Sequence, residues 1–169
     1  MASLFWSDFR TEQKRRFRFE LKFSNKSEGA AAAIPVWTVK TATKPKANVS
    51  LIEHQYIDHT FKYPGRVTWD PITITLVDPV HPDLSFAFLD ILGASGYKFP
   101  TTAATSKLSL SKRKFKDQIG LIFIDQIDEN GAIIERWSLM NPWITSVDFG
   151  GALDYTSDEM NEVTIEVQY

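Results

Sequence analysis

The sequence has 169 residues, enough for one domain with a sizeable core, and 43% of them are apolar. It has no cysteine, which excludes disulfides, thiolate metal sites and cysteine nucleophiles. The net charge is only −2, yet residues 120–169 hold ten acidic and one basic side chain (−9), leaving 18 basic and 11 acidic elsewhere (+7). Two interpretations of this asymmetry stay open. Either the charges lie on solvent-exposed faces and differ between regions without further meaning, or a basic part of one copy associates head to tail with an acidic part of the next.

Alternation of apolar and polar residues predicts the first strands. Residues 16–23 alternate strictly between apolar and charged side chains, as in a half-buried strand. Residues 36–43 are rich in β-branched residues and predict a second strand. Residues 48–57 and 60–63 predict a third strand that bends at Asp58.

The stretch of residues 45–79 reads as exposed strands without chemistry. Pro64-Gly65 is a turn signal within it. In residues 66–77 the apolar positions change from odd to even at Asp70-Pro71, which predicts a β-bulge there that keeps one face buried on both sides. Proline donates no backbone hydrogen bond, so this site is expected at a sheet edge or a bulge.

The second half of the sequence holds the helical signals. Asp83 opens a predicted helix that ends near Gly93, and residues 109–116 form a possible short, basic helix. Asn130-Gly131 predicts a hairpin turn between two further strands. Those strands, and the strand that closes the chain, cover residues 119–127, 132–140 and 163–169.

These elements predict a mainly β fold, a β-sandwich or small barrel of seven or eight strands with one flanking α-helix. We expect a single domain over residues 1–169, of which residues 1–15 form an extended or flexible N-terminal arm. Neither a signal peptide nor a membrane-spanning segment is expected, so the membrane is not a predicted partner.

No arrangement of residues predicts a catalytic, cofactor or metal site. His54 and His59 are expected on opposite faces of one strand, which gives no chelating pair. Residues 125–131 resemble a calcium loop only superficially, and a hairpin turn is favoured there. The basic clusters at residues 14–18 and 112–116 suit either phosphate contact or a solvated or inter-subunit face, and the acidic chain favours the latter.

Four segments in their order and spacing resemble the tail tube proteins of contractile-tailed bacteriophages, the T4-like group especially. They are residues 36–45, 63–78, 141–145 and 163–167. No single motif is diagnostic, but the resemblance spans residues 16–169. The fold that it implies is the phage tail-tube type, also called Hcp-like after the tubes of secretion systems.

The resemblance implies a structural role. Such subunits form hexameric rings that stack into a hollow tube inside a contractile sheath, and neighbouring subunits join their sheets into one inner β-barrel. Viral DNA and the tape-measure protein occupy the lumen, and the tube starts from the baseplate. The implied partners are further copies of the chain, the tail sheath protein, the baseplate and tape-measure proteins, and DNA that passes without sequence-specific binding. The implied location is the virion, with assembly in the host bacterial cytoplasm, and no enzymatic activity is expected.

Two sets of residues are candidates for this role. The strands around residues 45–79 have exposed edges, which a protein tolerates when these edges pair with those of another copy. Residues in this stretch are therefore candidates for inter-subunit contact. The other set is a polar to acidic face that would let DNA slide, although a solvent or subunit contact suits it equally. The candidate inter-subunit residues are Tyr63, Arg66, Trp69, Asp70 and Pro71, and the candidate lumen-facing residues are Glu162, Thr164, Glu166 and Gln168.

Other roles stay open. One is a baseplate-proximal tube initiator, or the tube protein of a phage-derived contractile injection or secretion system. From another class, a monomeric ligand-binding β-barrel would need an apolar cavity and blunted edges. An enzyme on a β-sandwich would need a catalytic constellation, and the sequence shows none.

Overall fold

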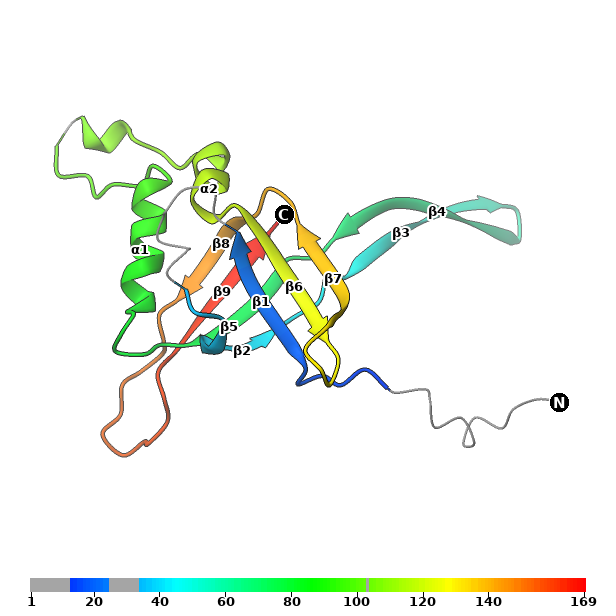
Figure 1. Cartoon of the computed structure of the whole chain (residues 1–169). Helices are drawn as coiled ribbons and strands as arrows, with labels where there is room; N and C mark the ends of the chain where they lie inside the picture. Colours follow the sequence, from blue (N-terminus) through cyan, green and yellow to red (C-terminus); the bar gives the residue numbers. More distant parts are fainter. Residues whose placement is uncertain (1–12, 25–33, 103) are drawn as a thin grey trace.

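The computed structural model describes residues 13–24, 34–102 and 104–169 (Figure 1). Over these residues the chain forms nine strands and two α-helices. The strands are β1 (Phe19–Ser24), β2 (Val39–Ala42), β3 (Ala47–Tyr56), β4 (His59–Trp69), β5 (Ile72–Val77), β6 (Leu121–Ile127), β7 (Ile133–Leu139), β8 (Trp143–Asp148) and β9 (Glu162–Gln168). The helices are α1 (Leu84–Ala94) and α2 (Lys112–Ile119).

The strands form three antiparallel sheets. The first has the order β1-β6-β7, the second β2-β5-β9-β8, and the third consists of β3 and β4 alone. The first two sheets pack face to face, with α1 and α2 beside them, and β3–β4 projects from this body as a long arm (Figure 1). The mainly β sandwich with a flanking helix is confirmed.

The core lies between the first two sheets and the helices. In β5 and β9 every second side chain is fully buried, and these inward residues pair across the two strands. Burying each such side chain contributes about 1.5–3 kcal/mol to the free energy of folding, so the alternation along the strands strongly favours this register. The core residues of these strands and of the facing sheet are Ile72, Ile74, Leu76, Val163, Ile165 and Val167, with Leu21, Ile122 and Ile124 opposite.

Both helices lie close to where the sequence places them. The Asp83 side chain accepts a hydrogen bond from the Phe86 backbone N–H at 2.9 Å, so it caps α1 as expected. The short basic helix is real, although α2 covers residues 112–119 instead of 109–116. Gly120, with φ of +74°, ends it in a conformation that favours glycine.

The described residues contain nine strands where seven or eight were expected. Residues 66–77 are divided between β4 and β5, and β8 was not predicted as a strand. Most of the predicted N-terminal arm, residues 1–12, lies outside the described residues.

The turn predicted at Pro64-Gly65 is wrong. The hairpin closes at Ile57-Asp58, where Tyr56 pairs with His59, and Pro64-Gly65 lies inside β4. Proline is tolerated there because β4 has a partner strand on one side only. The register shifts beside it, between Val49 and Leu51, so the bulge lies here.

The bulge predicted at Asp70-Pro71 is also wrong, because the chain changes sheets there. β4 pairs only with β3, while β5 pairs with β2 and β9 in the body. Two different faces are therefore apolar before and after Pro71. The change of phase in the sequence marks the boundary between the arm and the core.

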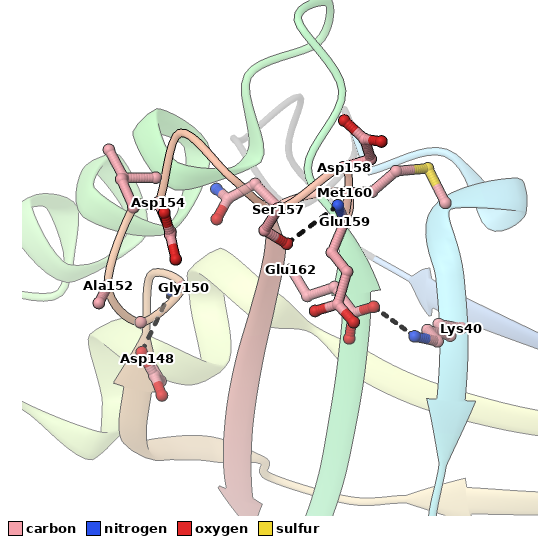
Figure 2. Close-up of a pocket in the computed structure, with 13 residues that line it drawn as sticks. Lys40, Asp148, Gly150, Ala152, Asp154, Ser157, Asp158, Glu159, Met160 and Glu162 are labelled. Atoms are coloured by element: carbon pink, nitrogen blue, oxygen red, sulfur yellow. Dashed lines mark hydrogen bonds and ion pairs between the residues drawn. The ribbon is translucent and has the colours of Figure 1, made fainter.

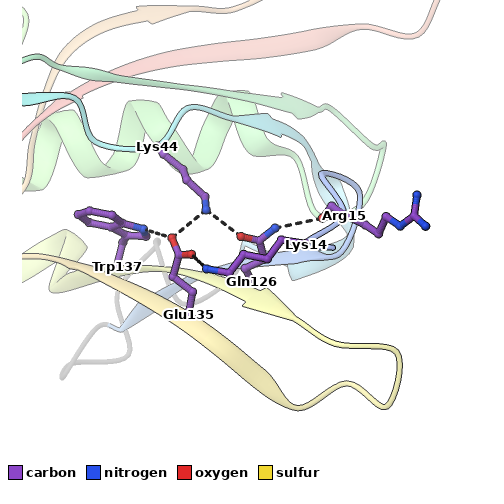
Figure 3. A network of polar contacts seen from close by, with 6 residues as sticks. All are labelled: Lys14, Arg15, Lys44, Gln126, Glu135 and Trp137. Carbon is purple, nitrogen blue, oxygen red and sulfur yellow. Dashed lines mark hydrogen bonds and ion pairs between the residues drawn. The ribbon is translucent and has the colours of Figure 1, made fainter. Parts of the chain in front are cut away.

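A polar network ties the two large sheets together at their open side (Figure 3). Lys44, just after β2, donates to Gln126 Oε1 of β6 and to Glu135 Oε1 of β7, both at 2.8 Å. Glu135 also accepts from Trp137 Nε1 and from Lys14. A hollow of about 960 Å³ lies at this seam between β1 and β2. The network therefore holds the sheets together where no backbone ladder joins them.

Asp125 of β6 is a second electrostatic anchor. Its side chain is fully buried, and Arg136 of β7 donates to its two oxygens at 2.6 and 2.7 Å. The Arg136 guanidinium holds the pKa of this carboxyl below its ordinary value.

Within the described residues, no helix is long and apolar enough to cross a membrane.

Stability should fall in acid in a way that depends on Glu135. Hydrogen bonds from Lys14, Lys44 and Trp137 lower the pKa of Glu135 to about 2. Since the folded pKa lies below the unfolded one, the stabilisation is complete above the unfolded pKa of about 4.3 and is lost as the pH falls toward 2. Glu135→Gln should flatten the loss of unfolding free energy between pH 5 and 2, measured by urea denaturation. Asp90→Asn, at an exposed carboxylate on α1, should leave the slope as it is, and an unchanged slope in Glu135→Gln would contradict the network's role.

Candidate functional site

The outer half of the β3–β4 arm is amphipathic. Cross-strand pairs such as Ile52–Tyr63 and His54–Phe61 share one face, and pairs such as Glu53–Lys62 share the other. The first face carries large apolar and aromatic side chains that lie about half exposed or more. In soluble proteins the apolar face of a sheet is normally covered by another element, whereas in the single chain this face is exposed to solvent.

The inner half of the arm turns its apolar side chains to the opposite face. Val49 pairs with Val67 there, and Ala47 pairs with Trp69. The change occurs at the bulge: Arg66 N–H donates to Ser50 Oγ at 2.8 Å, and a Cβ on Gly65 would lie 2.3 Å from that same oxygen. One extra residue in β4 thus turns the odd-numbered apolar residues of this strand to the other side of the arm, and in β3 the apolar positions themselves change from odd to even at the same level.

The tip of the arm carries local strain. Ile57 has φ of +52° and is 84% exposed. A β-branched residue in the left-handed region costs about 1–2 kcal/mol, and asparagine or glycine normally takes this place in two-residue hairpin turns. Neither the stability nor the solubility of the single chain explains an isoleucine here, which makes the tip a candidate contact.

The predicted inter-subunit residues do not form one cluster. They are strung along the arm and its base. Tyr63 lies on the apolar face of the outer half, and Arg66 lies at the bulge. Trp69, Asp70 and Pro71 lie where the arm joins the body. All five are at least partly exposed, and their role between subunits stays a prediction.

The base of the arm is fixed by specific contacts. Asn48 Nδ2 donates to Asp70 Oδ1 at 2.6 Å, and Lys46 lies 3.4 Å from the other carboxylate oxygen. The Asn48 hydrogen bond, with help from Lys46, lowers the pKa of Asp70. The ring centre of Trp69 lies 6.5 Å from that of Tyr169 at the end of the chain. The arm therefore leaves the body in a defined direction.

The second sheet presents a polar outer face. The predicted lumen-facing residues share this side of β9, opposite the buried residues of the same strand. Thr73 pairs with Glu166 and Thr75 with Thr164, and Ser146 of β8 lies on the other side of Glu166. The charged residues of this face are Lys40, Asp148, Glu162 and Glu166. The face is thus polar with an acidic excess, while its position relative to a lumen stays a prediction.

Both edges of this sheet are unpaired in the part of the chain that the structure describes. β2 pairs only with β5, and β8 pairs only with β9. Unpaired edges expose backbone N–H and C=O groups that can pair with another chain. The four-stranded sheet therefore has a polar outer face and a free edge on each side that can accept a further strand.

The described residues contain no group of three or more His, Asp or Glu that could hold a metal ion. The expectation that His54 and His59 lie on opposite faces is wrong, because the hairpin turns between them and places both on one face of the arm. Sequence reasoning also missed Ile57 as a site residue, since its only signal is the lack of a glycine or asparagine at the turn.

The sequence matches no protein-family model and no curated protein. Solved structures do match. A chain in the six-fold symmetrised structure of the anti-feeding prophage baseplate is 13% identical with a TM-score of 0.65, and the match covers 94% of this chain and 93% of that one. A chain in the sheath/tube terminator of an extracellular contractile injection system, PVC, is 16% identical with a TM-score of 0.63, covering 93% and 92%. A chain in the sheath-tube complex of the same system is 16% identical with a TM-score of 0.59, covering 93% and 88%.

These likenesses show the fold. The chain shares its fold, over nearly its whole length, with components of contractile injection particles. The predicted tail-tube type of fold is confirmed at this level, while the likeness to the T4-like group in particular stays a prediction.

Amide hydrogen exchange should separate the arm from the body. A two-stranded sheet without a covered face is marginally stable alone, so amides of β3 and β4 beyond the bulge should exchange far faster than those of β5 and β9 in the unassembled chain. Mass spectrometry of exchanged peptides would measure this. Equal protection in both regions would show that the arm does not behave as an isolated hairpin.

Removing the strain at the tip should stabilise the arm. Ile57→Asn places a residue that tolerates a left-handed backbone at the turn, so the opening free energy of the arm should rise by about 1 kcal/mol, or roughly fivefold slower exchange. His59→Asn, next to the turn, serves as the control and should give no such gain. If Ile57→Asn exchanges as fast as the parent chain, the strain at Ile57 is not a determinant of arm stability.

Proposed function

We propose that this chain is a structural subunit, without enzymatic activity, of a hollow tube in a contractile tail or injection particle. Copies join side by side into closed rings, hexameric as the sequence resemblance implies, and the rings stack. The observation that carries the proposal is the second sheet, which has a buried apolar face, a polar outer face and two open edges.

Edge pairing explains how the ring closes. The free edge of β8 in one copy pairs with the free edge of β2 in the next, so each copy uses two different surfaces. Such a contact between unlike surfaces closes when the rotation per copy completes a circle, and then no edge remains exposed. The four-stranded sheets become one barrel with the outer face of β9 turned toward the lumen.

The polar outer face suits passage of a polyanion. Glu162 and Glu166 outnumber the single Lys40 on this face, so phosphates meet no dense basic lining that would bind them. In a phage this cargo is viral DNA, and the tape-measure protein occupies the same lumen before ejection. The tail sheath and baseplate proteins are the proposed outer and terminal partners, the virion is the proposed location, and assembly takes place in the host cytoplasm.

The arm provides further contacts between neighbouring copies. Its uncovered apolar faces, one on each side of the bulge, are buried when it lies across neighbouring copies. Tyr63 and Arg66 on the arm, with Trp69, Asp70 and Pro71 at its base, are the proposed inter-subunit residues. The tip residue Ile57 joins this set because of its exposure and strain.

A second role has support of its own. Similar chains occur in a baseplate structure and in a sheath/tube terminator, so this chain suits equally a baseplate-proximal initiator or the tube of an injection system. A tube-body protein polymerises without limit, whereas an initiator stops at one ring. The extent of assembly therefore separates the two roles.

Electron microscopy of the purified chain tests the proposal. Rings or tubes with a central hole are expected, and Ile52→Ser with Phe61→Ser on the apolar face of the arm should reduce assembly at least tenfold because the buried apolar surface is lost. Gln55→Ser with Thr60→Ser, on the polar face of the same arm, is the matched control and should assemble normally. A chain that stays monomeric even when a baseplate template is supplied would overturn the proposal and favour the monomeric β-barrel.

A further inference from the structure

The connection between β8 and β9 is long and has a defined shape. Residues 149–161 contain no helix or strand, and connections of this length are usually functional. Asp154 Oδ1 accepts from the backbone N–H and the hydroxyl of Thr156, both at 2.9 Å, which lowers the pKa of Asp154. Asn161 Nδ2 donates to Asp78 in the body at 3.3 Å. The segment from Asp148 to Glu162 is called the acidic loop below.

The acidic loop is uniformly negative and partly apolar. It holds five carboxylates and no basic residue. Its side chains surround a hollow of about 710 Å³, and Lys40 reaches in from β2 to pair with Glu162 (Figure 2). The hydrogen bond and charge of Glu162, and to a smaller extent the charge of Glu159, raise the pKa of Lys40. Three large apolar side chains of the loop are also uncovered: Leu153, Tyr155 and Met160.

The opposite charge gathers on α2. Four basic side chains of this helix are exposed, and none of them forms an ion pair with another of the described residues. They are Lys112, Arg113, Lys114 and Lys116. Phe115 and Ile119 bury the other side of the helix in the core, so the basic side faces outward. The four basic residues are called the basic helix face below. Leu108 and Leu110, which precede α2, are about half exposed, so this surface is partly apolar as well.

The acidic loop and the basic helix face lie at opposite ends of the body. β8 begins at the end where α2 packs and runs away from it to Asp148, where the acidic loop starts (Figure 1). Both β6 and β8 start at the α2 end, since β7 runs back to that end between them. A second copy displaced along this direction therefore brings its basic helix face to the acidic loop of the first.

We propose that the acidic loop of one copy docks on the basic helix face of a copy in the next ring, which makes it the contact that stacks rings. This inference rests on the proposed tube function. Stems of lysine and arginine cover Leu153, Tyr155 and Met160, while their charged ends meet the carboxylates around the hollow. Head-to-head stacking sets like charges against each other, so the same contact fixes the polarity of the tube.

Charge reversal on each side tests the contact. In one variant Asp158→Lys and Glu159→Lys make the loop less acidic, and in the other Lys112→Glu and Arg113→Glu reverse the first turn of α2, where acidic residues favour the helix dipole. Each variant alone should form rings that do not stack, seen by electron microscopy. Parent tubes should shorten or separate into rings as salt is raised from about 0.05 to about 0.5 M, because screening weakens charged contacts.

Mixing the two variants in equal amounts gives the decisive result. In an alternating stack, every second junction joins the unsubstituted acidic loop to the unsubstituted basic helix face, and at the others the two new lysines of the loop meet the two new glutamates of α2, so mixing should restore tubes at least tenfold over either variant alone. A variant that had merely failed to fold would not be rescued by mixing. Asp90→Lys, an exposed reversal on α1, is the control and should stack like the parent chain.

The outcomes separate the two proposals. If the parent chain forms no rings at all, the tube function fails. If rings form and both variants stack into tubes like the parent, the tube function stands and the acidic-loop contact is wrong. If the variants stop at rings and the mixture does not restore stacking, the two surfaces do not contact each other and the inference is likewise wrong.

Discussion

A pair of antiparallel strands cannot cover its own apolar side chains, and this constraint governs the molecule. The β3–β4 arm leaves the core, and beyond its base, where Trp69 meets Tyr169, its aromatic and aliphatic residues lie about half exposed or more in the described chain. The bulge at Gly65 places these residues on opposite sides of the arm in its two halves. A single flat partner could cover only one of these sides, which is why we infer contacts with more than one neighbouring copy.

The alternation along β9 links folding to the proposed lumen. Val163, Ile165 and Val167 must face the core, and this alone sends Glu162 and Glu166 outward. A slip of one residue would bury the carboxylates, so the register that stabilises the fold also fixes the outer face. The burial of the apolar residues of β9 is thus enough to place its polar residues on the outer face.

Strict alternation made β1, β9 and the shared face of the lumen candidates predictable from the sequence, and Asp83 made the start of α1 predictable. The arm was not. Pro64-Gly65 has the chemistry of a turn but serves as a bulge, and Ile57 lacks that chemistry but forms the turn. Cross-strand pairing along the whole β3–β4 hairpin overrode the local turn preferences of these residues. The meeting of Lys44 with Gln126 and Glu135 was equally invisible, because it depends on how two sheets pack.

The two proposed contacts of the body differ in their physics, and this predicts an order of assembly. Edge pairing of β2 with β8 uses backbone hydrogen bonds, which screening by salt hardly weakens. The acidic loop and the basic helix face attract over a longer range but are weakened by salt. In the proposed tube, sideways contacts therefore set the ring, and charged contacts set the stacking and its direction. In the proposed tube, opposite charges at opposite ends favour head-to-tail growth over head-to-head growth, and this gives the tube the polarity that delivery of cargo in one direction requires.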